Sequence, residues 1–170
     1  MLIFVATEVM LFVGILSAFT ITKASAPFGW PPPDQPRLPL EQTAINTLAL
    51  LASGVLLLIA DRKFVKAPKS ARGWVGASLV LGMAFVGLQG HEWVALIAQG
   101  LTMTSHQLGS FFYLIVGCHA LHALAAILAL GWTFVVLLRG SLTSSAFRTV
   151  QVFWYFVVGI WPVLYYVVYL

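Results

Sequence analysis

Five apolar stretches of membrane-spanning length decide what this chain can fold into. The hydrocarbon core of a bilayer is about 30 Å thick, and a helix needs about 20 predominantly apolar residues to cross it. Stretches of that kind lie at about 1–22, 41–60, 73–98, 109–138 and 150–170. We therefore predict an all-α fold, a polytopic membrane bundle of five transmembrane helices.

The composition supports a membrane protein and excludes several other classes. Hydrophobic residues make up 61% of the 170 residues and charged residues only 8%, whereas a soluble domain carries roughly 25% charged residues. A chain of this length makes one small bundle, so we predict a single transmembrane domain over residues 1–170. The single cysteine, Cys118, provides no disulfide framework, and a net charge of +4 does not suggest nucleic acid.

Basic residues are concentrated in two of the predicted loops. Five lie between the second and third spans and two between the fourth and fifth spans: Arg62, Lys63, Lys66, Lys69, Arg72, Arg139 and Arg148. Cytoplasmic loops carry an excess of Lys and Arg. We therefore expect the N-terminus in the cytoplasm and the C-terminus on the opposite, outer side.

Small residues recur along the spans where helices could approach closely. They are Gly14 with Ala18, Gly73 with Ala77, Gly82, Gly87, Gly109 and Gly117. Helix association in lipid has no hydrophobic driving force and depends on close packing at such residues. Glycine is also simply common in membrane helices, so specific packing and plain composition are both open interpretations.

Glu8 places a carboxyl group inside the first apolar stretch. A charged residue in a span costs about 2.5–3.5 kcal/mol on insertion scales and marks a functional site by default. A rise of about 1.5 Å per residue puts Glu8 roughly 10 Å from the inner end of its span, and His119 roughly 15 Å from the outer start of its own. We expect a protonated Glu8 that hydrogen-bonds to His119 or His122. It either holds helices together or takes part in proton or lipid interaction.

His119 and His122 are three residues apart and are predicted to point from one helix face. Imidazole is the commonest metal ligand, so metal or haem binding is one interpretation. The Glu-x-x-His pairs of di-iron bundles are absent. This absence favours hydrogen bonding to Glu8 or to the backbone, and we predict no metal site and no catalytic residue in this chain.

Five further residues are candidates for contacts with lipid or with a partner. His91 and Glu92 lie about 10 Å from the outer end of the third span, and Glu92 is either an interfacial anchor or a functional group. Trp30 precedes three prolines, which favour a rigid polyproline II stretch; this loop is either a partner contact or a simple connection. Asn46 in the second span and Arg62 in the basic loop complete the set.

Six stretches, in order along the chain, share the pattern of one known family. They read TEVMLFVG from Thr7, WPP from Trp30, LPL from Leu38, NTLALLASG from Asn46, LQGHEW from Leu88 and GSFFYLIVGCHALH from Gly109. Together they resemble the corresponding elements of subunit III of cytochrome c oxidase and related haem-copper oxidases. The similarity covers nearly the whole chain. The five spans correspond to the shorter form of the family, which lacks the first two helices of seven-span members.

The resemblance implies an accessory, non-catalytic subunit of a respiratory oxidase in the bacterial plasma membrane. In that family haem and copper belong to subunits I and II, so this chain would carry no redox cofactor. Subunit III packs against and stabilises subunit I, holds phospholipid in a cleft beside the family's first two helices, and supports proton uptake. Glu8 falls on the family's carbodiimide-reactive intramembrane glutamate. The partners implied are subunits I and II and phospholipid, within the oxidase or a larger respiratory supercomplex.

The last span departs from the family pattern. Members usually end in Trp-x-Phe-Val-Asp-x-x-Trp, with His in the first variable place, whereas here Tyr155 stands for the His and Val158 for the Asp. Ala120 also replaces the usual Gly between the two histidines. These changes indicate a divergent member and bear on any proton-handling role of that pair.

Two other function classes compete with the accessory role. One is a stand-alone membrane cytochrome that uses His91, His119 and His122 as axial haem ligands. The other is a small transporter or channel. Against the second, the charged residues line no path through the bundle, and the sequence lacks the internal inverted repeat of many transporters.

Overall fold

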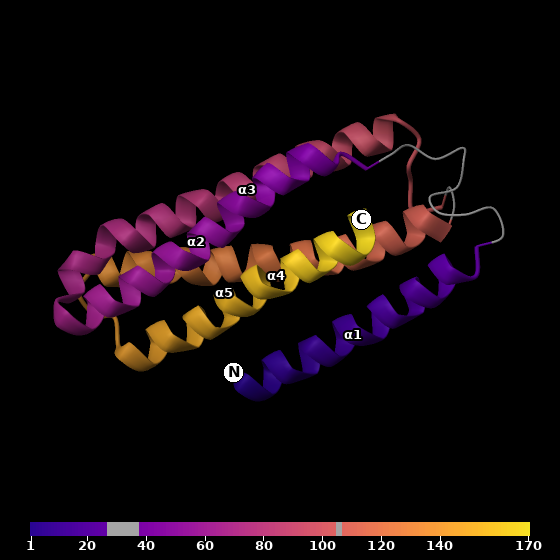
Figure 1. Cartoon of the computed structure of the whole chain (residues 1–170). Coiled ribbons are helices and arrows are strands. Elements are labelled where there is room, and N and C mark those ends of the chain that lie inside the picture. Colours follow the sequence, from indigo (N-terminus) through magenta and orange to yellow (C-terminus); the bar gives the residue numbers. More distant parts are fainter. Residues whose placement is uncertain (27–37, 105–106) are drawn as a thin grey trace.

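The computed structural model describes residues 1–26, 38–104 and 107–170, and its regular elements are helical. Five long helices form an elongated bundle (Figure 1). They are α1 (Leu2–Ala24), α2 (Leu40–Lys66), α3 (Arg72–Ala98), α4 (Gln107–Leu138) and α5 (Ser144–Leu164). A 3₁₀ turn, η1 (Pro68–Ala71), joins α2 to α3, and a π-helical turn, η2 (Tyr165–Tyr169), extends α5.

Each of the five helices is long and apolar enough to cross a membrane, by length and composition, in the part of the chain that the structure describes. This confirms the predicted class. The physical reason is that lipid offers no water to the backbone, so an apolar segment must satisfy its N–H and C=O groups internally, as a helix does.

Two helices extend beyond the apolar stretches that predicted them. The second span was expected to end near residue 60, but α2 continues to Lys66, so Arg62 lies in a helix and not in a loop. The fifth was expected from residue 150, but α5 begins at Ser144, where the Thr143 side chain accepts a hydrogen bond from the Ala146 N–H at 3.3 Å. Arg and Lys are good helix formers, so a helix can continue beyond the end of its apolar stretch.

Glycines end two of the helices in the same way. Gly100 follows α3 with φ +90° and Gly140 follows α4 with φ +75°. After each of them the next residue donates its N–H five residues back, from Leu101 to Leu96 and from Ser141 to Val136. These are Schellman motifs, in which only glycine adopts the left-handed conformation without strain.

Four of the helices form the body of the bundle, and α1 lies at its edge (Figure 1). Helix α2 packs along α3, α4 packs along α5, and α3 against α4 and α2 against α5 close the body. Helix α1 contacts α4 and α5 and buries only Phe12, Leu16 and Phe19. Most of the α1 surface is therefore left for lipid or for another subunit.

Small residues allow close packing at some of the predicted positions only. A Cβ atom placed on Gly82 would lie 2.5 Å from the Trp154 ring, so this glycine seats the fully buried indole of α5 against α3. At Gly14, Gly73 and Gly87 a Cβ would meet nothing within 4 Å. Of the two interpretations left open for these glycines, specific close packing applies at Gly82 and does not apply, within this chain, at the other three.

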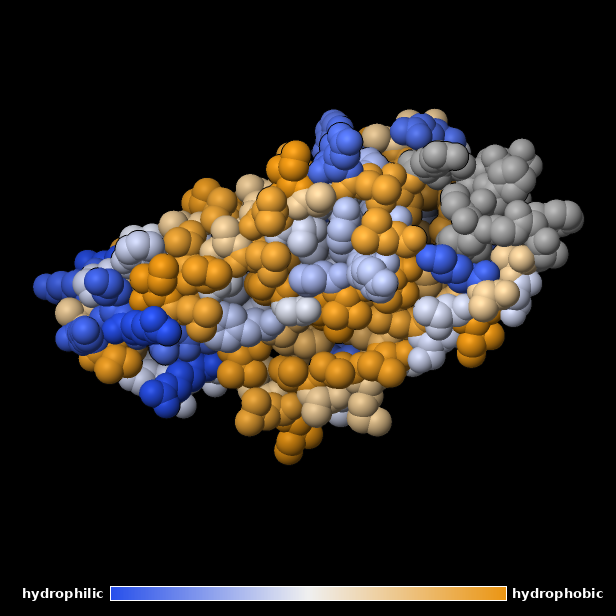
Figure 2. All heavy atoms as spheres, in the orientation of Figure 1, coloured by the Kyte–Doolittle hydropathy of each residue, from blue (hydrophilic) through white to orange (hydrophobic). Residues whose placement is uncertain are grey.

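The surface of the bundle is apolar along its length and hydrophilic at one end in particular. Figure 2 shows the most hydrophilic residues gathered on the left, at the end where α2 turns into α3 in Figure 1. Arg72 contributes there by donating to the backbone carbonyls of Leu137 and Leu138, at 3.4 and 3.0 Å, which are among the last of α4. A cation at a helix C-terminus also interacts favourably with the helix dipole.

We predict that Gly82→Ala destabilises the protein by about 1–3 kcal/mol, because the added methyl group overpacks the Trp154 site. The matched control is Gly87→Ala on the same helix, where the methyl group meets nothing and only helix propensity changes. Thermal unfolding of the two variants in the same detergent measures the difference. Equal midpoints would contradict the close contact.

Candidate functional site

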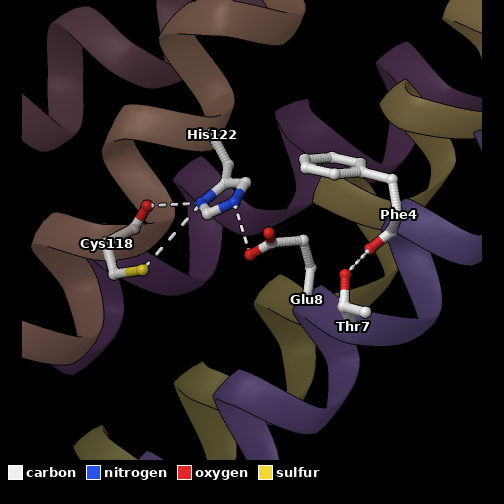
Figure 3. A network of polar contacts seen from close by, with 5 residues as sticks. All are labelled: Phe4, Thr7, Glu8, Cys118 and His122. Atoms are coloured by element: carbon white, nitrogen blue, oxygen red, sulfur yellow. Dashed lines mark hydrogen bonds and ion pairs between the residues drawn. The ribbon is translucent and has the colours of Figure 1, made fainter.

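Glu8 and His122 form an intramembrane polar pair between α1 and α4. Glu8 Oε2 lies 2.9 Å from His122 Nε2, and the two side chains are 17% and 15% exposed. Figure 3 shows the carboxyl group pointing at the imidazole, with Cys118 on the other side of the ring. Of the two histidines expected as partners for Glu8, the structure pairs it with His122.

The protonation of this pair follows from the second ring nitrogen. His122 Nδ1 lies 2.8 Å from the Cys118 carbonyl oxygen, which can only accept, so Nδ1 carries the proton. The contact between Nε2 and Oε2 then needs one further proton, either on Glu8 as a neutral acid or on His122 as an imidazolium beside a carboxylate. The pair has no net charge in either arrangement, which suits a low-dielectric medium.

Aromatic rings surround the pair. Phe12, Phe156 and Phe153 have ring centroids 5.7, 5.8 and 6.3 Å from that of His122. The Thr7, Ser17, Thr20 and Thr22 hydroxyl groups of α1 donate to carbonyls of α1 itself. Within the described residues, Glu8 is therefore the side chain that links α1 to the bundle by a hydrogen bond.

His119 does not join this pair, and the prediction that both histidines point from one face is wrong. Positions three apart differ by about 60° around a helix, and this difference sends the two rings into different spaces. His119 is 1% exposed and packs between α3 and α5, with its centroid 4.8 Å from Trp161 and 6.2 Å from Phe85. Neither of its nitrogens has a hydrogen-bond partner among the described residues.

A second polar cluster lies inside the body of the bundle, between α2 and α3. Glu92 Oε2 is 2.9 Å from both Thr43 Oγ1 and Gln89 Nε2. The Asn46 amide donates to Gln89 Oε1 and to the Phe85 carbonyl, each at 3.2 Å. The face of α3 that carries Glu92 packs on α2, so Glu92 is 5% exposed and its carboxyl group lies inside the bundle.

Two members of α5 and η2 extend this cluster. The Trp161 indole N–H donates to Thr47 Oγ1 at 2.8 Å, and Gln89 Nε2 is 3.2 Å from the Tyr169 hydroxyl oxygen. Asn46 and Glu92 of this cluster were among the residues predicted from the sequence, whereas the other members were missed: Thr43, Thr47, Gln89, Trp161 and Tyr169. The helical spacing of Thr43, Asn46, Thr47 and Leu50 was the available signal, since it places them on one face.

The other predicted residues lie apart from both clusters. His91 and Arg62 are exposed, on α3 and on the last turns of α2. Trp30 lies outside the described residues. Within the described ranges, no group of three or more His, Cys, Asp or Glu side chains gathers where it could hold a metal ion.

Comparison with known proteins identifies the chain. The family described as cytochrome c oxidase subunit III matches residues 1–170. The chain belongs to this family. It is 32% identical to "Probable cytochrome c oxidase subunit 3" of Mycobacterium leprae, over 98% of this chain and 84% of that protein. It is 29% identical to the protein of the same name from Nocardia farcinica, over 99% and 84% of the two chains.

Subunits of quinol oxidases are also similar to this subunit III. The cytochrome bo(3) ubiquinol oxidase subunit 3 of Pseudomonas aeruginosa is 28% identical over 99% of this chain and 81% of that protein. The family assignment confirms the resemblance inferred from the motifs. This subunit III is therefore a multi-pass membrane protein of a haem-copper oxidase, in the respiratory chain, and it assembles with other oxidase subunits.

Two of the three departures of this subunit III from the family pattern, Tyr155 and Val158, lie on α5. Val158 is 7% exposed and packs on Gly54 of α2, where an added Cβ would lie 3.0 Å from Val158 Cγ1. The Tyr155 hydroxyl is buried and has no hydrogen-bond partner in the described part of the chain. An aspartate at 158 would be buried against a glycine, so this position now serves helix packing.

We predict opposite outcomes for replacing the two histidines of this subunit III by phenylalanine. His122→Phe leaves Glu8 without its partner in lipid and costs about 1–3 kcal/mol. His119→Phe removes two unpaired nitrogens and keeps the ring stacked on Trp161, so it is nearly neutral or stabilising. Thermal unfolding of both variants tests this order, and a greater loss for His119→Phe would contradict it.

Proposed function

We propose that this chain is an accessory subunit III without a redox centre of its own, which packs against subunit I and stabilises it. The observation that carries this proposal is the family match over the whole chain. Haem and copper would then be held by subunits I and II, and electrons would not pass through this chain. The proposal extends to bound phospholipid and to support of proton uptake during oxygen reduction.

The environment of the histidines supports this role over that of a stand-alone cytochrome. An axial haem ligand needs a ring nitrogen with a lone pair directed at the iron. Both nitrogens of His122 are engaged, by the Cys118 carbonyl and by Glu8. His119 is enclosed by the rings of Trp161 and Phe85, which occupy the place a porphyrin plane would need. His91 is exposed on another helix face.

The Glu8–His122 pair supports a role in proton uptake. The pair binds one proton between Oε2 and Nε2 in addition to the proton on Nδ1. That proton can move between the carboxyl and the imidazole over 2.9 Å without changing the net charge in the membrane. A group of this kind can hold a proton close to the catalytic subunit and return it. The polar groups form two separate clusters and not a path, which disfavours a transporter.

The exposure of α1 supports phospholipid binding along this helix. Its apolar residues Leu2, Ile3, Met10, Val13 and Ile21 are at least 56% exposed. Phospholipid acyl chains would lie along this surface, in the space between α1 and the neighbouring subunits. The same acyl chains would cover the exposed edge of the Glu8–His122 pair. We further propose that the N-terminus is cytoplasmic and the C-terminus periplasmic in a bacterial plasma membrane, because the basic residues of the α2–α3 and α4–α5 turns share one end.

Purification of the tagged chain from native membranes in mild detergent tests the accessory role. We expect haem and copper subunits to co-purify, with oxygen reduction and a haem spectrum, while the chain expressed alone is colourless. A haem spectrum from the isolated chain would support the cytochrome alternative. A chain that purifies alone and without haem would contradict the proposal.

We predict that Glu8→Gln keeps the complex assembled and retains most of its oxygen-reduction rate. The glutamine amide can still donate to His122 Nε2, so the α1–α4 link survives while the titratable proton is removed. Proton uptake measured with a pH dye during turnover is expected to fall more than oxygen consumption does. Loss of haem from the purified variant would contradict the proposal that this subunit has only an accessory role. Unchanged proton uptake would show that Glu8 does not take part in proton uptake.

A further inference from the structure

The interior cluster around Glu92 contains a carboxyl group that the proposed function does not use. Glu92 is 5% exposed, and its Oε2 meets a hydroxyl group and an amide. No Lys or Arg forms an ion pair with it in the part of the chain that the structure describes. A carboxylate buried inside the bundle without a cation is costly, whereas a hydrogen-bonded neutral acid costs much less.

The single hydroxyl hydrogen of Thr43 indicates whether the Glu92 carboxyl group is protonated. Thr43 Oγ1 lies 2.8 Å from the Pro39 carbonyl oxygen and 2.9 Å from Glu92 Oε2, but a hydroxyl group has one hydrogen to donate. If that hydrogen goes to an ionised Glu92, the hydroxyl and carbonyl oxygens of Thr43 and Pro39 face each other at 2.8 Å without a hydrogen between them. If Glu92 is protonated, it donates to Thr43 and Thr43 donates to Pro39, and both contacts are hydrogen bonds.

Gln89 fits the neutral acid equally well. Its amide nitrogen donates to Glu92 Oε2 and faces the Tyr169 hydroxyl, while its oxygen accepts from Asn46. The donor and acceptor ends of this amide are therefore fixed by three different helical elements. A hydroxyl oxygen on Glu92 still accepts one hydrogen bond, so the Gln89 contact survives protonation.

We propose that Glu92 holds a proton as a neutral carboxylic acid and forms a proton-binding site inside the bundle. The site is separate from the Glu8–His122 pair, since it lies between α2 and α3 and not between α1 and α4. The ligand of this site is the proton. Thr43 and Gln89 contact the Glu92 carboxyl group directly, and Tyr169 is hydrogen-bonded to Gln89. The site does not depend on the accessory role proposed above, because it follows from burial and hydrogen-bond geometry alone.

The site lies near one end of the bundle. Thr43 is in the first turn of α2 and Glu92 is in the last two turns of α3, so both lie near the end opposite to η1. The hydrogen-bonded path leads from Glu92 through Thr43 to the Pro39 carbonyl, just before α2 begins. The turn η2 covers the site, because Tyr169 is 7% exposed and the Tyr165 hydroxyl donates to the Leu40 carbonyl at 3.0 Å.

Other titratable groups lie on the elements packed around Glu92. Glu41 of α2 and His91 of α3 are exposed. On the remaining sides lie the phenols of Tyr165 and Tyr169 and the imidazole of His119, which stacks on Trp161. None of the five forms a hydrogen bond with Glu92 in the described chain, so the proton count rests on Thr43 and Gln89.

Infrared difference spectroscopy of the purified oxidase complex tests the proposal. The wild-type spectrum minus that of Glu92→Gln, at neutral pH, is expected to show one carbonyl band of a protonated carboxylic acid, and this band should shift in D₂O. Glu41→Gln, at an exposed carboxyl group of the same membrane end, is the matched control and should remove no such band. A difference spectrum that shows only carboxylate bands for Glu92→Gln would overturn the proposal.

A second variant keeps the test valid if Glu92→Gln does not assemble. Thr43→Val removes the oxygen that accepts the Glu92 proton and keeps the shape of the side chain. The carboxylic acid band should remain and move to higher frequency, because its O–H loses a hydrogen bond. A spectrum identical to the wild type would overturn the proposal, since it would show that no protonated acid contacts Thr43.

Discussion

The absence of water in the bilayer core is the constraint on which the rest of this structure depends. A polar group that loses its hydrogen bond in lipid has no solvent to replace it. In this subunit the intramembrane carboxyl groups have therefore found partners on other helices, Glu8 on α4 and Glu92 on α2. Each pairing fixes the rotation of the helices that it joins, because a helix turned by one residue would point its carboxyl group into hydrocarbon.

The two pairings join helices that differ in how much other contact they make with the bundle. Glu92 joins α2 and α3, which already share a long packed interface, so its cluster adds specificity to contacts that exist without it. Glu8 joins α1, which buries three of its residues, so here the polar link is a large part of what positions the helix. A change in protonation therefore has more structural consequence at Glu8 than at Glu92.

The sequence predicted what depends on segment length and missed what depends on helix rotation. Apolar length gave the five helices, because crossing a bilayer takes a fixed number of residues. It could not give the end of α2, since Arg62 is polar yet helical, or the directions of His119 and His122, which a difference of about 60° sends into different spaces. The burial of Glu92 depends on which face of α3 meets α2, and that is decided by the whole bundle.

Trp161 shows how polar and apolar contacts combine to form the body of the bundle. Its indole stacks on His119 of α4, its ring meets Phe85 of α3 edge-on at 4.9 Å, and its N–H bonds to Thr47 of α2. One side chain of α5 thus contacts the three other helices of the body. Helix α1 shares none of these contacts and meets α5 through Phe4 and Phe12. The subunit is accordingly a four-helix body to which α1 is attached by the Glu8–His122 hydrogen bond and by a few aromatic contacts.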